Sequence, residues 1–110
     1  MTARKLAPVH PGEMLREEFM IPLGLSLSEL ARQLDVPPNR ISQLLHGKRA
    51  LTADTALRLE QFFGWPARTW LHLQAEYDLE LSRRKSGRKR IHPHPRLQIH
   101  GKVGGQVRSA

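Results

Sequence analysis

Apolar residues recur at helical spacing along residues 10–84, in short runs separated by turn-forming residues. In LSLSELARQLDV, Ser26 and Glu29 have the S-x-x-E spacing of a capping box, in which each side chain binds the backbone amide of the other residue. The apolar residues of this run are spaced at i, i+3, i+4 and i+7: Leu27, Leu30, Ala31 and Leu34. The pattern predicts a helix over residues 27–34.

Two consecutive prolines, Pro37 and Pro38, precede the next apolar run. A residue before proline is held in the extended conformation that an N-cap requires, and the first helical position needs no amide. The pair therefore predicts the start of a helix rather than a break in one. We expect this helix to run from Pro38 to about His46 and to stop at Gly47, so that a tight turn joins it to the helix over 27–34.

Three further helices complete the pattern, and the chain shows neither strand-like alternation nor an internal repeat. We therefore predict an all-α fold of five short helices. Proline, capping and glycine residues mark the other three: about 11–20 with Pro11 first and Pro22 as the stop, an N-cap at Thr52 with a stop at Gly64, and Trp65-Pro66 through to about Arg84.

The exposed face of the helix after the prolines carries the candidate binding chemistry. Its apolar residues must face the neighbouring helices, which leaves Asn39, Arg40, Gln43 and His46 toward solvent. Arginine pairs with guanine, asparagine and glutamine pair with adenine, and the first turns of a recognition helix enter the major groove. We therefore predict that Asn39, Arg40 and Gln43 read DNA bases. The alternative, an ordinary solvated helix face, stays open.

Hydroxyl and cationic side chains flank this face on both sides. Two serines lie at the start of the helix over 27–34, and basic residues follow the helix that begins at Pro38. Such groups hold the phosphates of a DNA backbone and so position a recognition helix. The residues predicted to contact phosphates are Ser26, Ser28, Lys48, Arg49 and Thr52.

Charge divides the chain in two. The formal net charge is +8, yet residues 1–82 hold nine Lys/Arg against ten Asp/Glu, whereas residues 83–110 hold nine Lys/Arg and no acid. We therefore divide the chain into an arm (1–9), a helix-turn-helix domain for DNA binding and dimerisation (10–84) and a flexible, mobile basic tail (85–110). Because the tail attracts nucleic acid without sequence preference, specific binding by the domain must rest on its individual residues.

Composition excludes several classes of protein. The chain has no cysteine, so it has no disulfide, thiolate zinc site or cysteine nucleophile. No apolar run approaches the ~20 residues of a membrane span, and the start of the sequence lacks the apolar stretch of a signal peptide. We expect a cytoplasmic protein that has no membrane partner. Because no catalytic constellation is visible, we predict no enzyme activity, no cofactor and no small-molecule substrate.

One cluster has the spacing of a metal site. His10, Glu13 and Glu17 fall at i, i+3 and i+7. A single histidine with two solvent-facing carboxylates at the start of a helix is explained more simply by capping and by the helix dipole. We therefore predict no metal.

Three segments together resemble the HigA/VapI family of antitoxins, compact helix-turn-helix proteins of the Xre, lambda-repressor-like superfamily. They are HPGEMLREEFMIPLGLSLSELARQLDV, ISQLLHGKRALTADTALRLEQFFG and TWLHLQAEYDLELS, and they cover about residues 10–82 in the family's order and spacing. The chain departs from the family pattern at Asp35, where glycine would ease the turn, at Pro37-Pro38, and in the basic tail.

The resemblance implies a homodimeric repressor that binds the palindromic operator of its own operon. It also implies direct neutralisation of a HigB-type toxin, a small RelE-like ribonuclease that cleaves mRNA. By position, Asn39, Arg40 and Gln43 fall on the family's recognition helix. A second apolar stripe on the last helix, at Leu71 and Leu79, is then the expected dimer interface.

Four functions remain open on the sequence. The leading hypothesis is the repressor that also inhibits a toxin. The second is an interaction module that sequesters a toxin and reads DNA weakly, and the third is a stand-alone Xre-type transcriptional regulator. The fourth is a non-specific nucleic-acid binder driven by the basic tail; in the other three, the tail can be a solvated extension.

Overall fold

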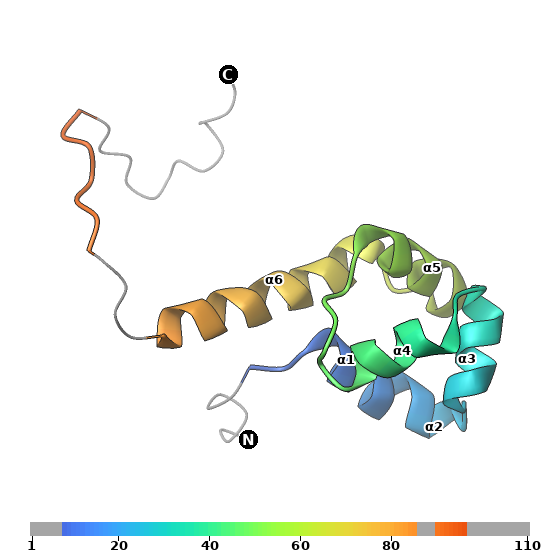
Figure 1. Cartoon of the computed structure of the whole chain (residues 1–110). Helices are drawn as coiled ribbons and strands as arrows, with labels where there is room; N and C mark the ends of the chain where they lie inside the picture. Colours follow the sequence, from blue (N-terminus) through green and yellow to red (C-terminus); the bar gives the residue numbers. More distant parts are fainter. Residues whose placement is uncertain (1–7, 86–89, 97–110) are drawn as a thin grey trace.

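The computed structural model describes residues 8–85 and 90–96, and within them every regular element is helical. The first helical stretch is continuous over residues 11–23, so the described part of the chain contains the five predicted helices of the all-α fold (Figure 1). The elements are α1 (Pro11–Met14), the π-helical segment η2 (Leu15–Met20), α2 (Ile21–Leu23), α3 (Leu27–Leu34), α4 (Pro38–Leu45), α5 (Ala53–Phe63) and α6 (Ala67–Arg84).

Most helix boundaries follow the predicted local signals. The Ser26 hydroxyl accepts from the Glu29 amide at 3.1 Å, and the Glu29 carboxylate accepts from the Ser26 amide at 2.9 Å, so the capping box is confirmed. Pro37 is the N-cap of α4 in extended conformation, with φ −63° and ψ 140°. The two prolines therefore start α4, as predicted, and Thr52 caps α5.

The predicted end of the first helix at Met20 is wrong. The helix continues through Pro22 to Leu23 and ends at Gly24 in the left-handed conformation. The reason is the π-helical register ahead of the proline, in which the Ile21 amide donates to the Arg16 carbonyl five residues back. A π-turn shifts the carbonyl that a proline ring would strike in an α-helix, so the helix tolerates the proline.

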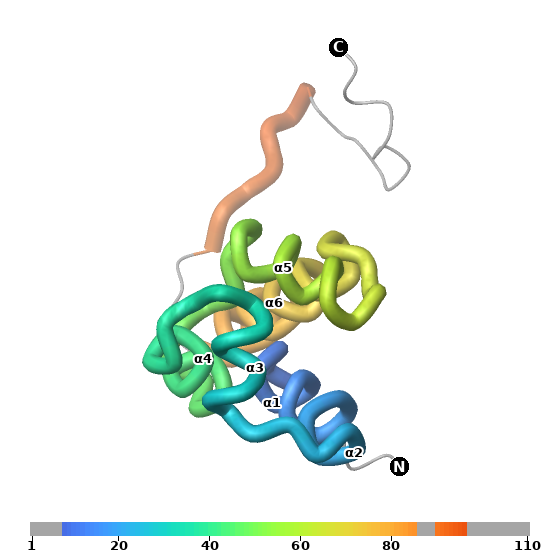
Figure 2. The backbone as a smooth tube through the Cα atoms, turned by 90° about the vertical axis from the view of Figure 1, so that its right-hand side faces the viewer, coloured from blue at the N-terminus to red at the C-terminus, as the bar shows by residue number. Residues whose placement is uncertain are grey.

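The helices pack in pairs around one apolar core. α3 packs on α4 and α5, α5 packs on α6, and α1 contacts both α4 and α6 (Figure 2). Six side chains that are almost completely inaccessible define the centre of the core, each contributing about 2 kcal/mol by its burial: Leu15, Leu30, Ile41, Leu44, Leu59 and Trp70. The second half of α6 extends beyond the other helices (Figure 1).

Gly12 allows α1 to approach the backbone of α4 directly. A Cβ atom at this position would overlap the Leu44 carbonyl oxygen, which no small shift of a side chain relieves. Both residues are buried. Only glycine fits this contact, which holds the first helix against the helix that carries the predicted base-reading residues.

Two predicted segments lie largely outside the description. Of the arm 1–9, residues 8 and 9 are described, and of the tail 85–110, residue 85 and residues 90–96. In these parts the tail residues are exposed and belong to no helix or strand. Among the described residues, no helix combines the length and apolar character needed to cross a membrane.

Candidate nucleic-acid interface

The turn between α3 and α4 makes these helices a helix-turn-helix unit. Asp35 adopts a left-handed conformation with φ 58°, and its amide donates to the carbonyls of Ala31 and Arg32 at the end of α3. An aspartate therefore occupies the backbone conformation that glycine adopts most easily. The chain reverses over residues 35–37, and α4 then begins at Pro38.

α4 divides into a buried and an exposed face as predicted. Ile41 and Leu44 are fully buried against the core, and Leu45 packs beside them. Asn39 is exposed, whereas Arg40 and Gln43 are half-buried. Among the described residues, the side-chain amide of Asn39 has no hydrogen-bond partner, but both other predicted base-reading residues do.

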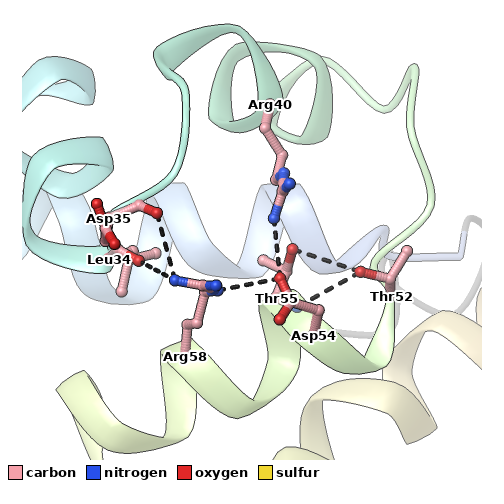
Figure 3. A network of polar contacts seen from close by, with 7 residues as sticks. All are labelled: Leu34, Asp35, Arg40, Thr52, Asp54, Thr55 and Arg58. Atoms are coloured by element: carbon pink, nitrogen blue, oxygen red, sulfur yellow. Dashed lines mark hydrogen bonds and ion pairs between the residues drawn. The ribbon is translucent and has the colours of Figure 1, made fainter.

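Arg40 is held by an aspartate of the next helix. Its Nη1 donates to Asp54 Oδ2 at 3.0 Å (Figure 3). The same oxygen accepts from Arg58 Nε, also at 3.0 Å. Arg58 Nη1 in turn donates to the carbonyls of Leu34 at 2.9 Å and Asp35 at 3.3 Å. One network therefore joins the start of α5 to the turn and to α4.

The two guanidinium groups keep Asp54 ionised. The hydrogen bond from Arg58, which is the larger effect, and the one from Arg40 lower the pKa of the Asp54 carboxyl below its ordinary value. Asp54 also lies in the first turn of α5, where the helix dipole favours a negative charge. A carboxylate that stays ionised to lower pH than an ordinary aspartate therefore stands beside the predicted guanine-reading arginine.

Gln43 has a partner among the predicted phosphate-contacting residues. Its Oε1 accepts from Arg49 Nε at 3.0 Å, so the amide group of Gln43 is free to donate. Lys48 and Arg49 are both exposed in the segment between α4 and α5. Thr52 ends this segment, and its hydroxyl accepts from the Thr55 amide at 3.4 Å.

The two serines lie apart from this group. Ser26 and Ser28 are exposed at the start of α3. The Ser26 hydroxyl is engaged in the capping box, and no described contact links either serine to the side chains of α4. The structure thus brings together Arg40 with the start of α5, and Gln43 with Arg49, but not the serines.

The Asp54 network was missed by reading the sequence. The sequence marks Asp54 only as an acid in the first turn of a helix. Its spacing to Arg58, i and i+4, was the available signal for an ion pair. The contact with Arg40 spans 14 positions along the chain, and no local pattern indicates it.

The remaining predicted residues lie outside this face. His10 caps α1, because its Nδ1 accepts from the Gly12 amide at 2.9 Å, while Glu13 and Glu17 are exposed. Of the two leucines predicted for the dimer interface, Leu71 is half-buried against the core and Leu79 is 46% exposed. Leu79 belongs to the second half of α6.

Comparison with known proteins identifies the family to which this chain is similar. A model described as helix-turn-helix matches residues 15–69, half of the chain. Virulence-associated protein I of Dichelobacter nodosus is 47% identical over 78 residues, which are 71% of this chain and 72% of the relative.

Two solved structures share the fold at substantial identity. An addiction module antidote protein of the HigA family from Coxiella burnetii is 44% identical, with a TM-score of 0.74 over 80% of this chain and 99% of the other. Pseudomonas aeruginosa antitoxin HigA, solved with the higBA promoter, is 39% identical, with a TM-score of 0.67 over 68% of this chain and 82% of the other. The chain belongs to the Xre-type helix-turn-helix family that includes the HigA antitoxins and virulence-associated proteins, a family of DNA-binding regulators rather than enzymes.

Proposed function

We propose that this protein is the antitoxin of a type II toxin–antitoxin module. In this role it represses its own operon through α4 and neutralises a HigB-type, mRNA-cleaving toxin by direct binding. The observation that carries the DNA-binding part is the polar face of α4, where Asn39, Arg40 and Gln43 occupy the first two turns beside Arg49. The same fold is seen in Pseudomonas aeruginosa HigA solved with promoter DNA.

The roles within this proposal follow from the chemistry of each side chain. Arg40 is assigned to guanine, and Asn39 and Gln43 to adenine, through donors that remain available after their contacts within the protein. Lys48, Arg49, Thr52, Ser26 and Ser28 are assigned to the phosphates on either side. Two copies bind the two halves of a palindrome, with Leu71 and Leu79 of α6 at the dimer contact.

Arg40→Ala and Gln43→Ala test the recognition helix. Each variant should lower the affinity for the operator about five- to 150-fold, the range that one base-specific pair contributes to discrimination. A gel shift with the operator, and with a scrambled duplex of equal length, measures this effect. Arg16→Ala is the matched control, because it removes an exposed arginine from η2. Operator binding by both variants at the parent level would mean that α4 does not read bases.

Toxin neutralisation needs a separate experiment. Co-expression with the product of the adjacent gene should yield a stable complex, and mRNA cleavage by that product should stop when the antitoxin is present. Arg40→Ala should still form the complex, since the variant alters only the DNA-facing side. Failure of the parent protein to bind the neighbouring gene product would contradict the antitoxin assignment but leave the repressor assignment intact.

One observation favours the alternative of an interaction module that reads DNA weakly. Arg40 and Gln43 are both already bonded within the protein, and residues 37 and 38 are prolines without side-chain hydrogen-bonding groups. The gel shift separates the two functions. An operator affinity no higher than that for scrambled DNA, together with toxin binding, favours the interaction module.

A further inference from the structure

We propose that Asp54 of α5 is a positioning residue that sets the base specificity of Arg40. The inference rests on the proposed function, because it concerns how the recognition helix reads DNA. Asp54 belongs to none of the predicted base or phosphate contacts. Asp54 acts through Arg40, which it holds.

Asp54 is itself held by contacts other than the one with Arg40. The Thr52 cap holds the first turn of α5, in which Asp54 lies. Arg58 Nε donates to the Asp54 carboxylate at 3.0 Å, while Arg58 Nη1 donates to the Leu34 carbonyl at the end of α3 (Figure 3). The Asp54 oxygen that receives Arg40 is thus tied through Arg58 to the packing of α5 against α3.

A held arginine reads DNA differently from a free one. A guanidinium has five N–H donors in a rigid plane, and the bond to Asp54 Oδ2 uses Nη1. The other donors remain for a guanine edge, in an orientation that the ion pair fixes. Because the ion pair already restricts the Arg40 side chain, Arg40 loses less rotamer freedom on binding the matching guanine than an unpaired arginine would. Arg40 can reach a phosphate or a wrong base that lies in another direction only by breaking the ion pair.

The Arg40–Asp54 ion pair lies at the surface, so its role in specificity can be separated from a role in folding. The Arg40 side chain is 30% exposed and that of Asp54 is 59% exposed. Exposed pairs of this kind contribute little to folding. A carboxylate near the DNA-facing side also repels phosphates. Loss of the charge should therefore leave the fold intact and leave non-operator binding unchanged or stronger, while discrimination falls. A structural defect would weaken all binding together.

Asp54→Asn in the full-length chain tests this role. The measured quantity is the ratio of the affinity for the operator to the affinity for duplexes changed at one base pair at a time. We expect this ratio to fall about fivefold at one position of each half-site, at the lower end of what one arginine–guanine pair contributes. Because the first turn of α5 favours a negative charge, Tm should fall by about a few °C while the protein stays folded. Glu76→Gln is the matched control, because it removes one negative charge from an exposed position on α6.

A double-mutant cycle with Arg40→Ala shows whether Asp54 acts through Arg40. In the Arg40→Ala background, Asp54→Asn should cause no further loss of discrimination. If Arg40→Ala abolishes discrimination but Asp54→Asn preserves it, the positioning role is wrong and the proposed function stands. If Arg40→Ala itself leaves operator binding unchanged, both the base reading by Arg40 and the role of Asp54 are overturned.

Discussion

At the scale of single residues, His10 shows how one buried side chain stabilises the start of a helix. It is buried at the start of α1, accepts from the Gly12 amide, and meets the Tyr77 ring edge-on at a centroid distance of 4.8 Å. Burial lowers the pKa of His10 below its ordinary 6.5, against the opposing effects of the Asp78 carboxylate, a hydrogen bond with the Arg49 backbone and the Glu13 carboxylate. The neutral ring is the form that caps the helix.

Acidification should therefore destabilise the protein through His10. A protonated Nδ1 cannot accept the Gly12 amide, and the pKa of His10 is lower in the folded than in the unfolded state. The stability that this difference in the pKa of His10 provides is fully present above about pH 6.5. It is lost as the pH falls through the pKa of His10 in the folded state. Thermal unfolding between pH 8 and pH 5 measures the loss. His10→Asn, which keeps a capping oxygen without titrating in this range, should show a flatter dependence. Parallel curves for the two proteins would exclude the effect.

At the scale of elements, capping and turn residues explain most helix ends. Ser26 and Thr52 accept from amides three positions on, and Pro37 starts α4 through its extended backbone, so these effects are readable from the chain. Pro22 is the exception, because residues 15–20 ahead of it are π-helical and the helix continues through the proline. Its place in the sequence indicates a stop, and only the packed helix shows continuation to Leu23.

The turn of the helix-turn-helix unit can be made more stable. Asp35 has a left-handed backbone and places a negative charge at the carboxyl end of α3, both of which are unfavourable. Asp35→Gly relieves both costs but adds conformational entropy to the unfolded chain. We expect a net gain of about 0.5 kcal/mol, or ~3 °C in Tm, by thermal unfolding.

Asp35→Ala is the control for the turn, since it removes the charge but keeps a Cβ in the left-handed conformation. It should be less stable than Asp35→Gly. Both variants retain the carbonyl that accepts from Arg58, so operator affinity should not change. If glycine were no more stable than alanine at this position, the backbone conformation would not be the source of the cost.

At the scale of the whole molecule, the second half of α6 extends beyond the other helices (Figure 1). Leu79 and Leu81 of α6 are 46% and 40% exposed. Tyr77 instead turns back toward His10 and the domain. The exposed leucines are available to a second copy, and Leu71, the other predicted dimer residue, is half-buried, with part of its side chain packed on the core of its own chain.

Leu79→Glu should convert the proposed dimer into a folded monomer. The side chain is exposed within one copy, so the change should leave the folded monomer intact, but it introduces charge into an apolar contact between copies. Operator affinity should fall at least about tenfold, because the two half-sites are no longer bound together. Light scattering gives the oligomeric state and a gel shift gives the affinity. Leu23→Glu, an equally polar change at an exposed leucine of α2, is the control. A variant that stays dimeric would place the interface elsewhere.

Local chemistry along the chain accounts for the five helices, the turn, and the exposed face of α4, because caps, prolines and apolar spacing act over a few residues. The organisation of the candidate interface does not follow from such signals. Arg40 meets Asp54 only because α3 packs on both α4 and α5, and Arg58 ties that arrangement to the turn. Ion pairs between helices depend on docking geometry, which spacing within either helix leaves undefined.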